Sequence, residues 1–208
     1  MKVLLVNGSP NAHGCTYTAL SEVASALNSE EIQTEIYQIG KGPVQGCIAC
    51  GYCGSAKECT FKNDVVSNAA EKIREADGFV FGSPVYCAGA TGQITSFLNR
   101  LNYSNKRGFL HKPGAAIVSC RRAGSTATLD QLNKYLVICQ MLLVGSQSWA
   151  MVHGTNPDEV RRDLEGMQTM RLLGRNMAWI LKSIEAGREA GIQLPKPEER
   201  IYSKFSYE

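Results

Sequence analysis

The chain opens with MKVLLVNGSPNAHGCTYTAL, residues 1–20, and this stretch decides the fold. Lys2 to Val6 form a short apolar run that ends in Asn7-Gly8-Ser9-Pro10, which is typical of a buried parallel strand followed by a turn. From Thr16 to Leu27 the apolar positions recur at helical spacing. A strand, a polar loop and a helix in this order predict the first unit of a parallel α/β sheet.

The same alternation continues along the chain. Asp64 can cap the helix that follows it, and Asp158 to Ala186, which lacks proline, predicts a long terminal helix or a broken pair. The further expected strands are 34–39, 78–82, 115–119 and one that begins at 142–145, and the further expected helices are 66–76, 94–101 and 129–139.

These elements predict an α/β fold with a doubly wound, five-stranded parallel sheet in the order 2-1-3-4-5 and helices on both faces. Crossover connections between parallel strands are right-handed. The loops that leave the first, third and fourth strands therefore gather at one edge of the sheet. That edge is the crevice in which such sheets bind their ligands.

Composition and charge exclude several classes of protein. The chain has 208 residues, which fits one α/β domain, and its net charge of +3 is too small to indicate a nucleic acid partner. No apolar stretch is long enough to span a bilayer, and the N-terminus reaches Gly and Pro too early for a signal peptide. We expect a cytoplasmic protein that binds neither nucleic acid nor membrane. Its expected parts are one domain at 1–190, a Cys-rich loop at 46–60 within it, and a C-terminal tail at 191–208.

The loop after the first strand has the groups that bind a phosphate monoester. A helix N-terminus offers unpaired N–H groups and a partial positive charge, and hydroxyls add further donors. The alternative is a polar turn in which Thr16 is only an N-cap. Walker A and G-x-G-x-x-G motifs are absent, and the residue six positions after Cys15 is Ser21 rather than the Arg of a cysteine phosphatase. The candidate phosphate-binding residues are Ser9, Asn11, Gly14, Cys15 and Thr16.

The loop after the third strand, Gly82-Ser83-Pro84-Val85-Tyr86, predicts a seat for a planar ring. Proline fixes the backbone, and its apolar and aromatic neighbours offer a flat surface for an isoalloxazine. The alternative is a strand-to-helix turn whose Tyr86 only covers the core. Together with the phosphate loop, the pattern favours a flavin.

Two arginines, Arg121 and Arg122, follow the fourth strand at the same edge. Their planar guanidinium groups could hold the flavin or the phosphate of a nicotinamide cofactor. Two solvated loop arginines are an equally good interpretation.

Four cysteines gather in one loop with the spacing C-x2-C-x2-C-x5-C: Cys47, Cys50, Cys53 and Cys59. Consecutive two-residue gaps wrap a chain around one face of a cubane, as in ferredoxin-type runs. Zinc sites usually separate two CxxC pairs by a dozen or more residues. The spacing therefore favours a [4Fe–4S] cluster over zinc, with a redox disulfide or four free thiols as further alternatives.

Several of these motifs together resemble a known family. V-N-G-S-P at residues 6–10, G-S-P-V-Y at 82–86, and Gly92 to Arg100 ahead of His111-Lys112-Pro113 are similar to the NADPH-dependent FMN reductase family of flavodoxin-like proteins. The four cysteines resemble those of its iron–sulfur flavoprotein branch. In three places the chain departs from the family pattern: Asn11 stands where a basic residue is common, Cys15 where Asn is common, and Asn99 where an Asp often precedes Arg100.

The resemblance implies where FMN and other subunits bind. The phosphate is expected on Ser9, Asn11, Cys15 and Thr16, the ring against Pro84, Val85 and Tyr86, and the loop that contains Cys120, Arg121 and Gly124 beside the ring. The resemblance also implies a homodimer or homotetramer in which the cluster faces the flavin of another subunit.

The predicted function is that of an FMN-dependent oxidoreductase or electron-transfer flavoprotein that relays electrons between a [4Fe–4S] cluster and FMN. The redox partner is a small molecule, such as NAD(P)H, or a ferredoxin-like protein. No side-chain acid or base is required, since the cofactor carries the chemistry. The alternatives are an NAD(P)H-dependent FMN or quinone reductase without a cluster, a carrier or redox sensor, and a flavin-free domain with a zinc loop.

Overall fold

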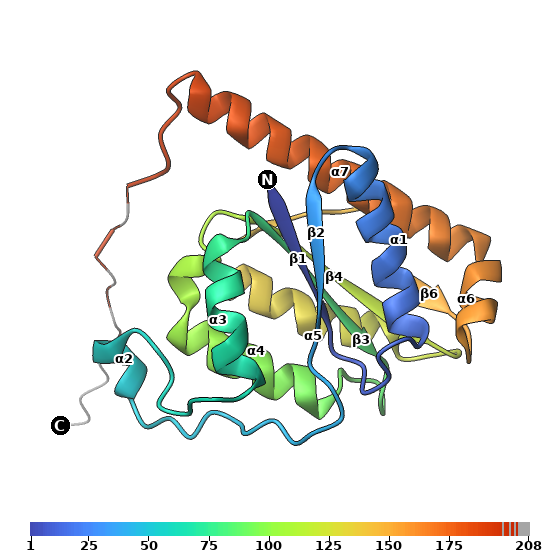
Figure 1. Cartoon of the computed structure of the whole chain (residues 1–208), viewed down its shortest axis with the longest axis horizontal. Helices are drawn as coiled ribbons and strands as arrows, with labels where there is room; N and C mark the ends of the chain where they lie inside the picture. Colours follow the sequence, from blue (N-terminus) through green and yellow to red (C-terminus); the bar gives the residue numbers. More distant parts are fainter. Residues whose placement is uncertain (197, 200, 202, 204–208) are drawn as a thin grey trace.

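The computed structural model describes residues 1–196, 198–199, 201 and 203, and there strands and helices alternate as predicted (Figure 1). The strands are β1 (Lys2–Asn7), β2 (Gln33–Gln38), β3 (Gly78–Pro84), β4 (Pro113–Cys120), β5 (Leu142–Leu143) and β6 (Met151–His153). The helices are α1 (Cys15–Ser29), α2 (Tyr52–Ala56), α3 (Val65–Glu75), α4 (Gly92–Ser104), α5 (Ser125–Ile138), α6 (Pro157–Arg162) and α7 (Leu164–Glu189), with a 3-10 turn at Lys106–Gly108.

The sheet has the predicted topology. Its strands are parallel and follow the order β2-β1-β3-β4-β5. The fifth position of the sheet is not one strand. Both β5 and β6 pair with β4, and β6 pairs nearer to the carboxyl end of β4 than β5 does. Between them the chain runs through Gly145-Ser146-Gln147-Ser148, residues with low strand propensity. Two short strands therefore share the position for which one was predicted.

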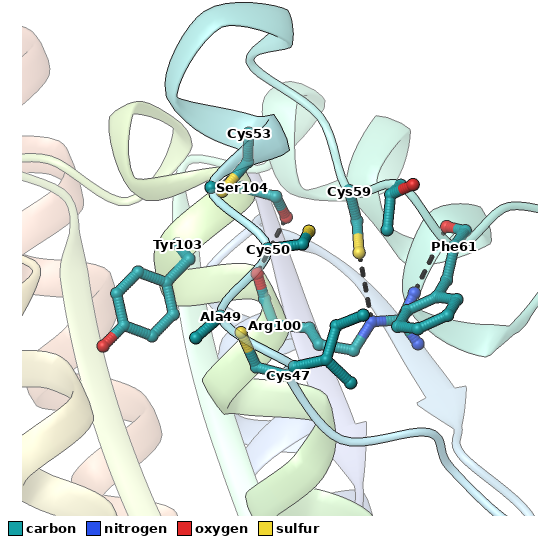
Figure 2. A pocket seen from close by; sticks show the side chains of 12 residues that line it. Cys47, Ala49, Cys50, Cys53, Cys59, Phe61, Arg100, Tyr103 and Ser104 are labelled. Carbon is teal, nitrogen blue, oxygen red and sulfur yellow. Dashed lines mark hydrogen bonds between the residues drawn. The ribbon is translucent and has the colours of Figure 1, made fainter.

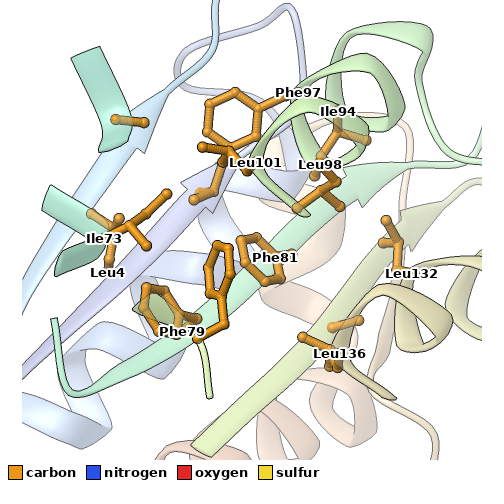
Figure 3. Close-up of a cluster of buried hydrophobic side chains, with 14 of the residues drawn as sticks. Leu4, Ile73, Phe79, Phe81, Ile94, Phe97, Leu98, Leu101, Leu132 and Leu136 are labelled. Carbon is orange, nitrogen blue, oxygen red and sulfur yellow. The ribbon is translucent and has the colours of Figure 1, made fainter. Parts of the chain in front are cut away.

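A separate apolar core covers each face of the sheet. On β1, Leu4 and Val6 face the core beneath α3, α4 and α5, whereas Val3 and Leu5 face the core beneath α1 and α7. Figure 3 shows the first of these cores, where Phe79 and Phe81 of β3 lie among side chains from the covering helices. This alternation is the period-two pattern of strands buried on both faces.

Capping residues set two of the predicted helix ends. Asp64 caps α3 as expected, since its carboxylate accepts from the backbone N–H groups of Val66 and Ser67. The Ser67 hydroxyl accepts in turn from the backbone N–H of Asp64 at 2.9 Å, which completes a capping box. The terminal helical segment is a broken pair, because α6 ends at Arg162 and the side chain of Asp163 caps α7. The Cys-rich loop follows β2 as expected, and it contains the short α2 near its middle (Figure 1).

Beyond α7, the expected C-terminal tail lies partly outside the described residues, which omit 197, 200, 202 and 204–208. Within the described part of the chain, every helix is too short or too polar to cross a bilayer.

Gly8 occupies a crowded position where the first loop leaves the sheet. A Cβ atom there would lie 2.7 Å from Ile94 Cβ and 2.8 Å from the carbonyl oxygen of Gly82. We therefore expect Gly8→Ala to lower the free energy of unfolding by about 1–3 kcal/mol, the usual effect of overpacking. Urea denaturation measures this change.

Gly42→Ala is the matched control, since among the described residues nothing lies within 4 Å of a Cβ at Gly42. An equal loss of stability in the two variants would contradict the packing argument.

Candidate functional site

Asn7, the last residue of β1, fixes the shape of the first loop from beneath. Its side chain is fully buried, and its Oδ1 accepts from the backbone N–H of Ser9 at 3.1 Å. Its Nδ2 donates to Oε1 of Gln38 at 2.5 Å and to the carbonyl oxygen of Asn11 at 3.4 Å. Gln38 in turn donates from Nε2 to the carbonyl oxygen of Ser9 at 2.7 Å. The ends of β1 and β2 therefore hold the loop at several points before any ligand binds.

The start of α1 leaves backbone donors available. Its N-cap is Gly14, and within the described chain no side chain caps this end. The interpretation of Thr16 as N-cap is therefore wrong: Thr16 lies inside the helix, buried, with its hydroxyl oxygen 2.8 Å from Oγ of Ser119 on β4. The N–H groups of the first turn lack partners within the helix, so they can bind an anion.

A cavity of about 640 Å³ lies against this loop. Three of the predicted phosphate residues line it, namely Asn11, Gly14 and Cys15. Ser9 and Thr16 are buried instead, with their hydroxyl groups in hydrogen bonds within the protein. The remaining wall was not predicted from the sequence, and it includes Gln38, Gly40, Lys41, Thr155, Asn156 and Pro157.

The expected seat for the ring is a tight turn at the end of β3. Tyr86 and Gly89 exchange backbone hydrogen bonds of 2.8 and 2.9 Å, and Cys87 and Ala88 between them have φ angles of 50° and 58°. Both angles lie in the left-handed region, so this turn is held in a conformation that non-glycine residues seldom adopt. Tyr86 is 51% exposed, which contradicts the alternative in which it only covers the core.

The loop after β4 packs directly on that turn, as the topology predicts. Val85 donates its N–H to the carbonyl oxygen of Ser119 at 2.9 Å. Gly124 has φ of +85°, and a Cβ there would lie 2.8 Å from Cα of Ala88. The positive φ angle and the lack of space for a Cβ atom therefore both require a glycine at this position. Arg121 and Arg122 are exposed on the same loop.

Two cysteines at this edge are held as neutral thiols. Burial raises the pKa of Cys15, and the nearby carboxylate of Glu159 adds to the effect. Burial also raises the pKa of Cys120, against hydrogen bonds from Ser125 and the backbone of Arg122. Because the thiolate is the reactive form, neither residue is activated as a nucleophile.

A second cavity, of about 210 Å³, lies at the far end of α4 and brings together all four cysteines of the loop. Figure 2 shows Cys47, Cys50, Cys53 and Cys59 around it, and all four are free thiols. In the described part of the chain, however, no three Cys, His, Asp or Glu side chains are close enough to form a metal site. The set of donors fits an iron–sulfur cluster, whereas the sulfur positions are more open than a bound cluster requires.

Arg100 of α4 is the buried charge beneath this cavity, and its side chain is 0% exposed. Its Nε donates to Sγ of Cys59 at 3.3 Å, and it forms an ion pair with Asp64. Further hydrogen bonds reach the carbonyl oxygens of Gln45, at 3.4 Å, and Phe61, at 3.3 Å. Arg100 and Asp64 could not be predicted as part of this site, because the cavity forms only when the loop folds back on α4.

Asp64 makes this region sensitive to acid. Partial burial raises the pKa of its carboxyl group, but hydrogen bonds from Arg100 and Ser67 outweigh that effect and hold the pKa below its ordinary value. The stabilisation from Asp64 is therefore present above the pKa of the unfolded chain, about 3.9, and is lost as pH falls through the lower value of the folded state.

We expect the stability of the wild type to fall more steeply than that of Asp64→Asn between about pH 6 and about pH 3. Asn preserves the helix cap but removes the titrating group. Urea denaturation at the two pH values tests this, and parallel losses would contradict it.

Comparisons with known proteins show the family to which the chain belongs. The NADPH-dependent FMN reductase family matches residues 1–156. An iron–sulfur flavoprotein of Methanocaldococcus jannaschii is 30% identical over 194 residues, which cover 89% of this chain and 100% of that protein.

Solved structures share the fold at low identity. The flavodoxin-like WrbA-like protein of Agrobacterium tumefaciens has a TM-score of 0.62 at 16% identity, over 88% of this chain and 98% of that one. A flavoenzyme NAD(P)H:(acceptor) oxidoreductase of Paracoccus denitrificans has a TM-score of 0.63 at 14% identity, over 88% of this chain and 97% of that one. The predicted flavodoxin-like fold is thereby confirmed. The chain belongs to the NADPH-dependent FMN reductase family, on the branch of the iron–sulfur flavoproteins, and is an FMN-dependent oxidoreductase.

Proposed function

We propose that this oxidoreductase passes electrons between a [4Fe–4S] cluster in the Cys-rich loop and FMN at the carboxyl edge of the sheet. One observation carries the proposal: the four cysteines of the loop line a single cavity, and that cavity lies on the same helix that begins at the ring-binding turn. When bound, FMN exchanges electrons singly or in pairs, and the cluster exchanges them singly. The protein binds, orients and tunes the two groups.

The phosphate of FMN would occupy the cavity at the start of α1. The backbone N–H groups of the first helical turn supply donors, and Asn11 and Cys15 line the space. Lys41, which reaches the same cavity from the loop after β2, supplies the positive charge that Asn11 does not. The phosphate would thus be held by a preformed loop and one cation.

The isoalloxazine ring would lie against Pro84, Val85 and Tyr86, with Arg121 and Gly124 at its border. The exposed Tyr86 side chain offers an aromatic face, and the turn that carries it is fixed by its own pair of hydrogen bonds. Cys120 is 6% exposed and supports this loop from within.

Helix α4 connects the two parts of the proposed relay. It begins at Gly92, three residues after the ring-binding turn, and reaches the cysteine cavity at Arg100, Tyr103 and Ser104. At 1.5 Å per residue, Gly92 and Arg100 are separated by about 12 Å along the helix axis. The two sites are therefore neighbours on one rigid element, which supports electron exchange between them.

We propose two classes of electron donor, a nicotinamide cofactor and a ferredoxin-like protein. Arg121 and Arg122 are exposed beside the ring site, where a guanidinium group could bind the phosphate of NADPH. The match to a family of NADPH-dependent reductases supports this donor.

A homodimer or homotetramer is also part of the proposal. In it the cluster of one subunit lies near the flavin of another, so the relay runs between subunits as well as along α4. Large apolar side chains are exposed at the surface, among them Tyr103 at 70%, Trp149 at 68% and Trp179 at 70%. Exposed aromatic side chains of this size are typical of surfaces that subunit contacts cover.

Anaerobic rapid mixing tests the relay. FMN-loaded protein with and without reconstituted iron is mixed with a reduced ferredoxin-type carrier or with NADPH, and flavin absorbance is followed. We expect the carrier to reduce the flavin faster in the iron-loaded protein. Equal rates in the two forms would contradict the relay.

A second candidate function is an NAD(P)H-dependent FMN or quinone reductase without a cluster. The open arrangement of the cysteine sulfurs, with no three of them close enough for a metal among the described residues, favours it. Rapid flavin reduction by NADPH that is independent of iron would support this function.

A further inference from the structure

The Cys-rich loop is closed by one side chain, that of Arg100. Its guanidinium group bonds to the carbonyl oxygen of Gln45, before the first cysteine of the loop, and to that of Phe61, after the last. The same group donates to the sulfur of Cys59 and pairs with Asp64 at the start of α3. Both ends of the loop are thus attached to a single point on α4.

Such a buried cation requires a specific role. Burial of a charge is unfavourable unless the group is paired and its donors are satisfied. Arg100 has one carboxylate partner, Asp64, whose side chain is 30% exposed, and its Cζ lies 5.1 Å from the centre of the Phe61 ring. Three further N–H groups donate to two backbone carbonyl groups and one sulfur. A lysine has no planar fork and could not satisfy this set of acceptors at once.

The direction of the Nε–H group links this cation to the proposed cluster. A cluster held by four thiolates carries net negative charge, which increases on reduction. A cation and an N–H donor at a ligand sulfur stabilise the more negative form, so they raise the reduction potential. The guanidinium group of Arg100, which lines the cavity, supplies both the positive charge and the N–H donor at Cys59.

We infer that Arg100 is a positioning residue for the Cys-rich loop: it anchors residues 45–61 to α4 and raises the reduction potential of the cluster through Cys59. The second part rests on the proposed function, whereas the first part concerns the iron-free chain alone. The two parts therefore have separate measurements.

The anchoring is tested by amide hydrogen exchange of the iron-free protein. We expect Arg100→Gln to accelerate exchange across residues 45–61 by about tenfold or more, because the loop loses three anchoring hydrogen bonds. The FMN site should change little, so FMN affinity serves as the control for folding. Unchanged exchange in this segment would overturn the inference, whether or not the wild type binds iron.

The tuning is tested by anaerobic potentiometry of the iron-loaded protein, with Asp64→Asn as the matched variant. Arg100→Gln removes a positive charge, and we expect the equilibrium constant for cluster reduction to fall by about tenfold, which is about 59 mV for one electron. Asp64→Asn removes a negative charge but keeps the helix cap, so its potential should shift upward. A residue with a merely structural role would not give shifts of opposite sign.

Arg100→Lys keeps the inference testable if the Gln variant fails to fold. It retains the charge but loses the Nε–H donor, so we expect a smaller downward shift and faster exchange of the loop. Potentials that move in the same direction in the Arg100 and Asp64 variants, or that do not move, would overturn the tuning. Failure of the wild type to bind iron under anaerobic reconstitution would instead overturn the proposed relay, and hydrogen exchange would still decide the anchoring.

Discussion

The Asn7→Asp variant is expected to bind FMN about 100-fold more weakly than the wild type, which corresponds to about 2.8 kcal/mol. The substitution preserves the shape of the side chain but replaces its NH₂ donor by a carboxylate oxygen. That oxygen would face Oε1 of Gln38 and the carbonyl oxygen of Asn11, both of which accept from Asn7 in the wild type. Buried acceptors left without donors are among the most unfavourable changes in a hydrogen-bonded network.

Riboflavin, which lacks the phosphate, separates loop geometry from general damage. We expect its affinity to fall much less than that of FMN, since Asn7 shapes the phosphate loop rather than the ring site. Fluorescence titration measures both affinities. Asn68→Asp makes the same change of charge at an exposed position of α3 and should bind FMN normally. Equal losses for the two ligands would contradict the role given to Asn7.

The Cys50→Ser variant is expected to lose nearly all of its iron while it retains FMN. Cys50 is exposed and lines the cysteine cavity, so its replacement removes one ligand with little change in packing. A cubane has four thiolate positions, and iron should fall from about four atoms per chain to below about one after anaerobic reconstitution.

Cys87→Ser is the matched control, because Cys87 is also an exposed free thiol but lies in the turn after β3, outside the cysteine cavity. We expect it to keep its full content of iron. An equal iron content per chain in the wild type and in Cys50→Ser would show that Cys50 is not a ligand of the cluster.

Much of the fold could be predicted from the sequence, because the pattern of buried strands is local and strong. The run from Lys2 to Val6 and the cap at Asp64 each depend on neighbouring residues only, and both are found where expected. The division of the fifth strand was not predictable in the same way. Leu142 begins β5 and Met151 begins β6, and both strands pair with β4. That pairing is a contact between segments that are distant in sequence.

The sequence predicted which loops meet at one edge of the sheet more completely than which side chains hold them together. Loops after parallel strands meet at one edge by topology, so Asn11, Val85 and Gly124 were expected near one another. The role of Asn7 in holding the first loop was not predicted. A polar residue at the end of an apolar run is found at ordinary strand ends as well as at residues that anchor a loop. Arg100 was missed because its partners lie far from it in sequence and become its neighbours only through folding of the loop.

The most direct test of the proposed relay is an anaerobic absorbance spectrum of the reconstituted wild type, with iron, sulfide, zinc and FMN quantified in the same sample. We expect flavin bands together with a broad iron–sulfur shoulder, and about four irons and four sulfides per chain. Flavin without iron and sulfide, or zinc in the cysteine loop, would contradict the relay and leave an FMN reductase whose four clustered cysteines serve another purpose.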